Sequence, residues 1–374
     1  MKIIKEITRI LLGLTFIFSG FVKGIDPLGS TYKFTDYFNA MGNEWATRFA
    51  FILAVILALA EFGIGIALLF NYRLKIVSWL ALLFMAFFLP VTLWVAVKNP
   101  VSDCGCFGDA LVISNWQTFF KNIVLTIFAI IVVMQRSRFV NRFNIKYQNV
   151  GIILILLIFG FLQQHSYRHL PLIDFRPFKI GANIPDGMVM PADAPTDQYR
   201  TEFIYQDKQT GETKEFNETN YPWQDTLKWE YVDSKSILVK AGYHPPIHDF
   251  TMENSFGEDV SEFYLFDENY TFILVAYNLD KTITSNQNSI NSLAQEVLDH
   301  GMNFICLTSS GEEEIEQFKH SNNTPYEFLV CDEITLKTII RSNPGLLLTS
   351  AGTILGKWHW RDIPSFEKLE LDTK

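Results

Sequence analysis

Five long apolar runs occupy the first half of the chain, and a more polar pattern follows them. The runs are residues 7–23, 48–70, 75–97, 117–135 and 148–165. A helix needs roughly 20 apolar residues to cross a bilayer core of about 30 Å, and each run meets or approaches this length. No small-residue cleavage site follows the first run, so we interpret it as an uncleaved span rather than a signal peptide. The pattern predicts an α-helical membrane bundle with five spans.

The hydrophobic pattern changes after the fifth run. Prolines and mixed charges over 166–180 are typical of a linker. A hairpin is predicted from 203 to 216 with its turn at 208–211, and the alternation through Trp229 indicates a further strand. From 241 onward short apolar strands alternate with amphipathic helices, which predicts a soluble α/β domain. The expected divisions are 1–135 for a four-span membrane domain, 136–170 for a cytoplasmic loop and fifth span, 171–240 for a linker and small β-rich segment, and 241–374 for the α/β domain.

Charge divides the chain at nearly the same place. The first 165 residues carry 14 lysines and arginines against 7 acidic residues, whereas the remaining 209 carry 17 against 33. Basic residues such as Lys75 and Arg138 gather in alternate connections between the runs. Because cytoplasmic loops are enriched in them, we expect a cytoplasmic N-terminus, with the 98–116 loop and residues 166–374 outside. This predicts a multi-pass protein of the bacterial inner membrane with a periplasmic C-terminal domain, whose acidity argues against nucleic acid as a partner.

Two cysteines lie in the short polar loop after the third run. The segment is Asp103-Cys104-Gly105-Cys106-Phe107-Gly108-Asp109. A disulfide between Cys104 and Cys106 would close a small, strained ring, for which Gly105 supplies backbone freedom, and strained exposed disulfides are the labile ones. Three interpretations stay open: active thiol–disulfide chemistry, a static disulfide that clips the loop, and a metal site, for which two thiolates are few ligands. We interpret the neighbouring Phe107 as part of an interfacial aromatic belt.

Glu61 is the one acidic residue inside a predicted span. A carboxyl group in hydrocarbon is costly, so it is expected to face the bundle interior and to be protonated or paired. It could relay protons or contact a ligand. It could equally hydrogen-bond a neighbouring helix that Gly63 and Gly65 allow to approach closely. Lys23 is within reach as a partner, but we expect its amine to extend to the membrane interface instead.

The first four runs carry residues that resemble a known membrane family. The pattern Arg9-x-x-x-Gly13-Leu14-x-Phe16-Ile17-Phe18-Ser19-Gly20-Phe21-x-Lys23, followed by Glu61-x-Gly63-x-Gly65, is similar to the DoxX family, and Cys104-Gly105-Cys106-Phe107-Gly108 with Asn122 is similar to its MauE branch. The resemblance covers roughly residues 1–135. It implies a four-helix membrane core related to that of vitamin K epoxide reductase, and disulfide or quinone-linked redox chemistry. MauE itself is implicated in maturing a disulfide-rich periplasmic dehydrogenase subunit, but the long C-terminal extension departs from the minimal family.

The C-terminal part resembles the thioredoxin fold. Pro344, before a final hairpin, matches the position of that fold's cis-proline. Residues 277–285 contain no cysteine where thioredoxins carry Cys-x-x-Cys, so the resemblance implies a redox-inactive domain whose peptide-binding surface beside Pro344 binds a partner. Cys306 and Cys331 lie in or at the end of predicted strands and are expected to be buried and inert. The predicted strands are 272–277, 304–308 and 354–358, and the predicted helices are 287–300 and 311–320.

The leading hypothesis is a membrane protein for extracytoplasmic thiol–disulfide exchange or maturation of exported proteins. Cys104 and Cys106 would carry electrons, and Glu61 would relay protons to a quinone in the bundle. The outer domain would bind an exported or periplasmic protein client. The alternative is a non-enzymatic membrane scaffold whose degenerate thioredoxin-like domain binds a partner. A third interpretation, transport through the bundle, has only a single buried acid as its pathway.

Overall fold

The structure is a computed structural model, and it describes residues 2–101, 103–139, 144–240, 242–248, 250–369 and 371 of the 374-residue chain. The chain divides into two compact units. One unit joins Met1–Ala182 with Thr251–Lys374, and it contains the membrane helices and the α/β domain. The other unit is Asn183–Phe250.

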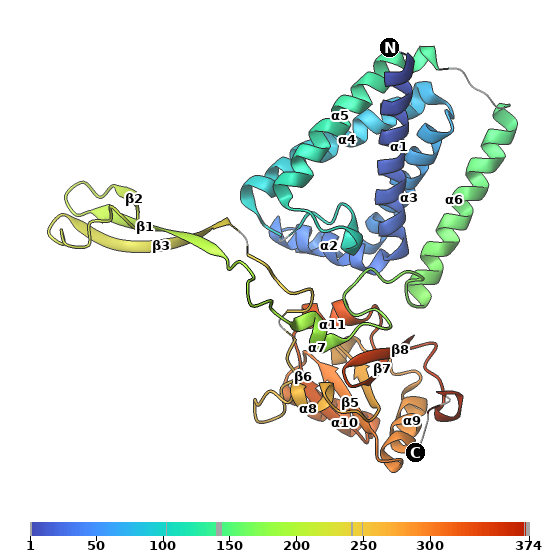
Figure 1. Ribbon diagram of the computed structural model, residues 1–374, viewed down its shortest axis with the longest axis vertical. Coiled ribbons are helices and arrows are strands. Elements are labelled where there is room, and N and C mark those ends of the chain that lie inside the picture. The colour runs from blue at the N-terminus through green and yellow to red at the C-terminus, as the bar shows by residue number, and fades with distance from the viewer. Residues whose placement is uncertain are drawn as a thin grey trace. The chain divides into compact units, whose positions relative to one another are not determined.

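Five helices in the described part of the chain are long and apolar enough to cross a membrane, as the sequence predicts. Large side chains on their outer surfaces, such as Leu83, Phe87 and Phe161, are exposed. Only a lipid environment gives these side chains a favourable surrounding, so the bilayer is the solvent of this part of the molecule. Figure 1 shows α1 beside α3 and α4 beside α5. The five helices are α1 (Lys2–Ile25), α3 (Ala50–Leu69), α4 (Leu74–Lys98), α5 (Asn115–Gln135) and α6 (Ile145–Arg168).

The first four of these helices share one buried apolar core. Small and branched residues dominate it, which lets the helices approach closely. At the start of α1, the buried Arg9 donates to the carbonyl oxygens of Leu68 and Leu69 and so satisfies the last turn of α3. The core residues are Leu12 and Phe16 from α1, Ala67 and Leu68 from α3, Leu74, Val77, Ala81 and Met85 from α4, and Leu125, Ala129 and Val132 from α5.

A further helix lies in the connection between the first two apolar runs, where the sequence predicts no helix. It is α2 (Pro27–Ala40), and the short 3-10 helix η1 (Glu44–Phe49) follows it. Asp26 caps α2 by accepting from the amide of Gly29 at 2.8 Å, and Pro27 occupies the first turn, where its missing N–H costs nothing. The apolar residues of α2 are too few and too mixed with polar ones to give a clear helical period, so the hydrophobic pattern does not predict this helix.

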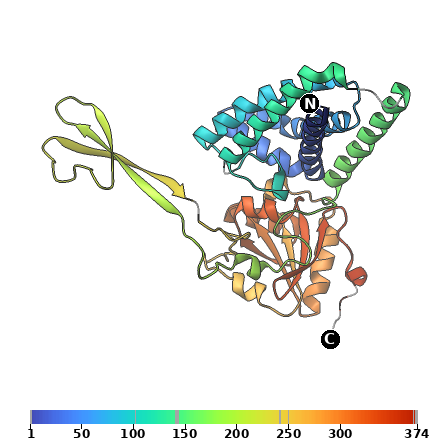
Figure 2. The ribbon, with the colours of Figure 1, turned by 45° about the horizontal axis from the view of Figure 1, so that its top comes forward.

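The α/β domain is built on one five-stranded sheet in the order β6-β5-β4-β7-β8. β4, β5 and β6 are parallel, β7 runs antiparallel to β4, and β8 runs antiparallel to β7. This is the topology of the thioredoxin fold, and the Asn343–Pro344 peptide before β7 is cis, as expected. The strands, side by side in Figure 2, are β4 (Thr271–Val275), β5 (Asn303–Thr308), β6 (Glu327–Val330), β7 (Gly345–Ser350) and β8 (Thr353–His359).

Helices cover this sheet and complete its core. Alternate strand residues such as Phe272 and Cys306 pack against Ile290 and Leu293 of α9 and Phe318 of α10. The strands and helices predicted from the sequence are confirmed, with ends shifted by a few residues. The helices of the domain are α8 (Ser261–Leu265), α9 (Gln287–Asp299), α10 (Glu312–Asn322) and α11 (Glu333–Ile339), with the 3-10 helices η4 (Leu279–Lys281) and η5 (Phe366–Leu369).

The second unit is a small antiparallel sheet. Its strands are β1 (Gln198–Asp207), β2 (Thr213–Asn217) and β3 (Trp229–Lys240), in the order β2-β1-β3, and the short helix α7 (Ile184–Met188) precedes them. The predicted hairpin is confirmed, with Phe203 opposite Phe216. The further strand is also confirmed and is longer than the alternation around Trp229 suggests.

The segment expected to be a linker, residues 166–180, is not a free connection. α6 extends to Arg168, and the side chains of Arg176 and Phe178 are buried. Lys357 on β8 donates to Asp174 Oδ2 and to the carbonyl oxygen of Phe178, both at 2.8 Å. The charged residues that suggest a linker instead form buried ionic contacts. A sequence pattern cannot distinguish a buried charged side chain from a solvated one.

Candidate functional site

A cavity of about 250 Å³ lies among the membrane helices and opens beside the two cysteines. Its walls are mainly aromatic and aliphatic, with Phe84, Phe88 and Met85 from α4 among them. Its polar lining includes Glu61 and the segment from Cys104 to Cys106. The structure therefore brings together, around one apolar space, the three residues that sequence analysis selects for chemistry.

Residues 103–109, called the dithiol loop below, adopt a compact turn. The sulfur atoms of Cys104 and Cys106 lie 3.4 Å apart as free thiols, and Gly105 has φ of +66°. A Cβ atom at Gly105 would come within 3.1 Å of the Lys33 side chain, so both the backbone conformation and the space favour glycine. Asp103 Oδ1 accepts from the Gly105 amide at 2.8 Å, which stabilises the turn.

Neighbouring helices hold the backbone of the dithiol loop. The Tyr37 hydroxyl on α2 donates to the carbonyl oxygen of Cys104 at 2.9 Å. On α1, the Ser19 hydroxyl lies 2.8 Å from the carbonyl oxygen of Cys106. Sequence analysis did not identify either residue as part of the site. Ser19 could have been identified, because it lies one helical turn before Lys23 on the same face of α1. Tyr37 belongs to α2, the helix that the hydrophobic pattern does not predict.

The two thiols have different acidities. The hydrogen bond from the Cys104 thiol lowers the pKa of Cys106 to about 6, and the nearby charges of Lys121 and Lys23 act in the same direction against burial. The same hydrogen bond, together with burial, raises the pKa of Cys104 well above its usual range. Cys106 is therefore the more acidic thiol of the pair. This is the asymmetry that thiol–disulfide exchange requires.

Glu61 forms a buried ion pair with Lys23. The lysine Nζ lies 2.8 Å from both carboxylate oxygens, and both side chains are largely buried. The expectation that Lys23 extends to the interface is therefore wrong: a close carboxylate in a low-dielectric surrounding outweighs the gain from reaching water. Ser19 accepts from Lys23 at 2.9 Å and lies 2.8 Å from Glu61 Oε2. Through Ser19, a continuous polar path joins the ion pair to the dithiol loop.

Glycines bring α1 and α3 close enough for this ion pair to form. A Cβ atom at Gly20 would lie 2.5 Å from the backbone nitrogen of Phe62, and one at Gly65 would lie 2.6 Å from that of Ile17. Gly65 thus has the packing role expected of it, whereas Gly63 faces the side chain of Leu156 on α6. The close helix contact and the polar cluster are parts of one arrangement.

Phe107 is buried rather than placed in an interfacial belt. Its ring packs against Phe18 at a centroid distance of 5.3 Å, and Lys121 Nζ lies 4.2 Å above the ring. The correction follows from the loop folding back onto α1, which the span pattern alone does not predict. Asn122, the residue noted in the MauE resemblance, lines the cavity and donates to Thr92 at 3.3 Å.

The residues selected in the α/β domain lie away from the cavity lining. Cys306 and Cys331 are buried; desolvation raises the pKa of Cys331 to about 12 and that of Cys306 further. Both thiols are protonated at neutral pH and shielded, as expected of inert cysteines. Pro344 is also buried, at the start of β7. A partner can therefore contact Pro344 only if the residues that cover it move aside.

Comparison with known families matches two parts of the chain. The family described as methylamine utilisation protein MauE matches residues 1–135, which contain the cavity and the dithiol loop. A domain of unknown function, DUF8463, matches residues 199–241 in the small antiparallel sheet. No curated protein matches the chain.

Solved structures also show similarity over part of the chain. One is an uncharacterized conserved protein from Geobacillus kaustophilus, with 14% identity, a TM-score of 0.25, and coverage of 29% of this chain and 64% of that one. Another is a thiol:disulfide interchange protein from Bacteroides sp., with 13% identity, a TM-score of 0.25, and coverage of 29% of this chain and 75% of that one. The chain thus spans slightly less than two thirds of the length of the first.

Proposed function

We propose that this membrane protein carries out thiol–disulfide exchange on the extracytoplasmic side, in the maturation of exported proteins. The observation that carries the proposal is the position of Cys104 and Cys106 at an apolar membrane cavity, with one thiol acidified and the other protonated. The match of residues 1–135 to the MauE family supports a membrane redox role.

In the proposed exchange, the oxidised pair receives two electrons from a client dithiol. A client thiolate attacks Cys104, and Cys106 leaves as a thiolate because Lys121 and Lys23 stabilise its charge. The second client thiolate then attacks the mixed disulfide and releases Cys104, which takes up a proton. The client has gained a disulfide, and Cys104 and Cys106 hold the two electrons.

Reoxidation requires an acceptor for two electrons and two protons, and the cavity suits a quinone. Its walls are apolar enough for a lipid-soluble ring, and Lys121 and Asn122 supply polar atoms at the lining. A quinone held by this lining would supply a two-electron, two-proton acceptor; Cys104 carries one of those protons, and the second would come from the aqueous side. Glu61 and Ser19 line the same cavity as Cys106, and we assign them the movement of protons between the dithiol and the cavity.

The distribution of charge supports the proposed orientation. Near the start of α1, Lys5 donates to the carbonyl oxygen of Arg138 at 2.6 Å, and both Lys5 and Arg9 lie over the ring of Phe139. These basic residues share one end of the bundle, which we place in the cytoplasm of a bacterial cell. The dithiol loop lies near the opposite end of α1 and therefore outside, in the periplasm.

The redox state of the dithiol loop tests this function. Intact cells are treated with an alkylating reagent, and the peptide of residues 99–120 is analysed by mass while the quinone pool and the oxidant supply are varied. We expect the ratio of disulfide to dithiol to follow the quinone pool, while Cys306 and Cys331 stay reduced as internal controls. A ratio that never changes would exclude the redox role.

One observation favours a different function, that of a membrane scaffold. Residues 277–285 follow β4 at the place where thioredoxins carry their redox pair, and they contain no cysteine, so the domain cannot exchange disulfides at this place. A scaffold would bind stoichiometric partners whether or not the thiols are present. Affinity purification of the intact chain with Cys104→Ser and Cys106→Ser together distinguishes the two, because redox clients but not scaffold partners should be lost.

A further inference from the structure

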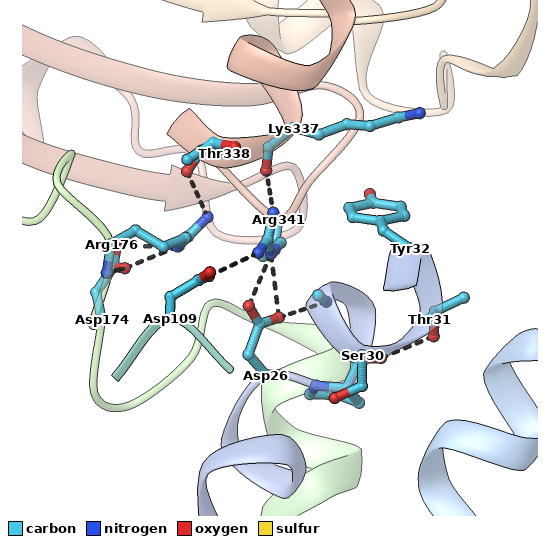
Figure 3. A network of polar contacts seen from close by, with 12 residues as sticks. Asp26, Ser30, Thr31, Tyr32, Asp109, Asp174, Arg176, Lys337, Thr338 and Arg341 are labelled. Atoms are coloured by element: carbon cyan, nitrogen blue, oxygen red, sulfur yellow. Dashed lines mark hydrogen bonds and ion pairs between the residues drawn. The ribbon is translucent and has the colours of Figure 1, made fainter. Parts of the chain in front are cut away.

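A buried arginine joins the thioredoxin-like domain to the membrane helices. Arg341, between α11 and β7, is 5% exposed, and its Nε lies 2.8 Å from Asp26 Oδ2 and 3.1 Å from Asp26 Oδ1. Its Nη2 lies 3.2 Å from Asp109 Oδ2, and its Nη1 donates to the carbonyl oxygen of Lys337 (Figure 3). Asp26 caps α2 and Asp109 ends the dithiol loop. One guanidinium therefore connects three segments that are remote in sequence.

The two carboxylates respond differently to this environment. Burial would raise the pKa of Asp26, but Arg341 and Arg176 outweigh it and hold that pKa below its usual range. At Asp109 burial prevails over the same arginines, and the pKa is raised. Asp26 is thus the firm ionic partner of Arg341, and Asp109 is the partner that can be released more readily.

Tyr32 of α2 adds an aromatic contact to the ionic one. Its ring centroid lies 5.3 Å from the Arg341 guanidinium and 5.2 Å from Lys337 Nζ, both at cation–π distance. Its hydroxyl lies 3.5 Å from that of Tyr277, which follows β4 at the place where thioredoxins lead into their redox cysteines. Tyr32 of α2 thus contacts both Tyr277 and Arg341, and Arg341 lies three residues before the buried Pro344.

Acidic residues fasten the dithiol loop at both ends. Asp103 pairs with Lys33 of α2 at 2.7 Å, and Asp109 pairs with Arg341 of the thioredoxin-like domain at 3.2 Å. The first contact stays within the membrane domain. The second links the C-terminal end of the loop to the thioredoxin-like domain, in addition to the contacts that α1 and α2 make with the loop.

We propose that the thioredoxin-like domain takes the dithiol loop of its own chain as a partner, with Arg341 as the positioning residue that holds Asp109. The docking itself needs no redox chemistry, and only its effect on exchange rests on the proposed function. A client that binds beside Pro344 would compete with the contacts that Tyr32 and Asp109 make with Arg341. Client binding would therefore release one end of the loop and expose Cys104 and Cys106.

Accessibility of the thiols tests this docking in the full-length protein in nanodiscs. The measurements are the rate of alkylation of Cys104 and Cys106 by a bulky maleimide, its pH profile, and hydrogen exchange over residues 103–110. Arg341→Gln and the milder Asp109→Asn should each raise the alkylation and exchange rates by about tenfold, since they free one end of the loop. Arg341→Lys should restore part of the protection, because a single ammonium can pair with one carboxylate.

Matched variants keep the result interpretable. Lys319→Gln removes a cation from an exposed pair with Glu316 on α10 and should leave every rate unchanged. If Arg341→Gln does not fold, Asp109→Asn still decides the question, because Asp109 is partly exposed. Wild-type rates in folded Asp109→Asn and Arg341→Gln would overturn the docking. That result would leave the redox function intact, and an unchanging redox state would equally leave the docking intact.

Discussion

Cys104 and Cys106 differ in chemistry although only Gly105 separates them. The difference comes from their surroundings: Cys106 receives a hydrogen bond and lies near two cations, while Cys104 donates that bond and is desolvated. Two thiols with the ordinary cysteine pKa of about 8.5 would both be mostly protonated at neutral pH. At the scale of the residue, the neighbours of the sulfur atoms rather than the Cys-Gly-Cys spacing prepare the site for exchange.

The pH dependence of alkylation checks this asymmetry. In the reduced protein, alkylation of Cys106 should rise with a midpoint near pH 6, following its pKa of about 6. Cys104→Ala removes the main cause of the lowered pKa, so the midpoint should move up toward the ordinary cysteine value of about 8.5. The midpoint is the proper readout, because a less acidic thiolate is also more nucleophilic and partly compensates the rate at pH 7.

A suitable control is Cys331→Ala, which lies outside the cavity lining and should leave the midpoint in place. An unshifted midpoint in Cys104→Ala would show that the cations alone acidify Cys106.

At the scale of the element, the contact between α1 and α3 determines whether the buried polar cluster exists. Neither helix could carry Lys23 or Glu61 alone in hydrocarbon without a large cost. The glycines Gly20 and Gly65 remove the side chains that would separate the helices, and the ion pair then forms at 2.8 Å. The glycines and the charged residues are therefore interdependent.

Alanine at Gly20 should disrupt this contact. The added Cβ would meet the backbone of Phe62 at 2.5 Å and that of Ala58 at 2.8 Å, and backbone cannot move aside as a flexible side chain can. We expect a loss of about 1–3 kcal/mol in stability, the usual cost of overpacking, measured as a lower thermal unfolding temperature in detergent.

Gly160→Ala is the matched control on α6, where an added Cβ meets nothing within 4 Å. It should be neutral or stabilise the helix by up to about 1 kcal/mol, since alanine favours a helix over glycine. Equal effects of the two substitutions would contradict the close-contact account of α1 and α3.

At the scale of the whole molecule, one compact unit contains both the membrane bundle and the thioredoxin-like domain. Besides Arg341, the end of α6 and the segment after it contribute to this connection: His169 lies 2.7 Å from Asp362, and Arg176 donates to the carbonyl oxygen of Thr338 at 2.9 Å. The domain is therefore held at several separate points. A domain that is connected to the membrane helices only by a flexible linker would make none of these contacts.

The proposed orientation predicts which parts of the molecule a membrane-impermeant thiol reagent can reach. In a Cys104→Ser, Cys106→Ser background, Leu227→Cys on the highly exposed connection before β3 should be labelled in intact spheroplasts. Lys75→Cys, at the exposed start of α4, should be labelled only after lysis. The reverse pattern would place the dithiol loop in the cytoplasm and exclude the proposed setting.

The spans, the strands and the dithiol segment could be predicted from the sequence, because each depends on residues that are close together in the chain. Membrane insertion depends on the summed hydrophobicity of one continuous run, so five spans could be counted without knowing how they pack. The thioredoxin-like strands were likewise visible as short, fully apolar runs such as that around Ile273. The helix α2 was not predicted, because its stability depends on packing and on the Asp26 cap rather than on a regular apolar period.

The partners of the charged residues depended on the fold. Lys23 and Glu61 are 38 residues apart, and Arg341 is 232 residues from Asp109 and 315 from Asp26. A sequence shows each charge together with its chain neighbours, whereas pairing energy depends on distance and dielectric in space. Local hydrophobicity therefore determines that this chain crosses the membrane and carries its dithiol in a polar segment between two spans. Which cations acidify that dithiol, and which domain holds it, follow only from how remote segments pack together.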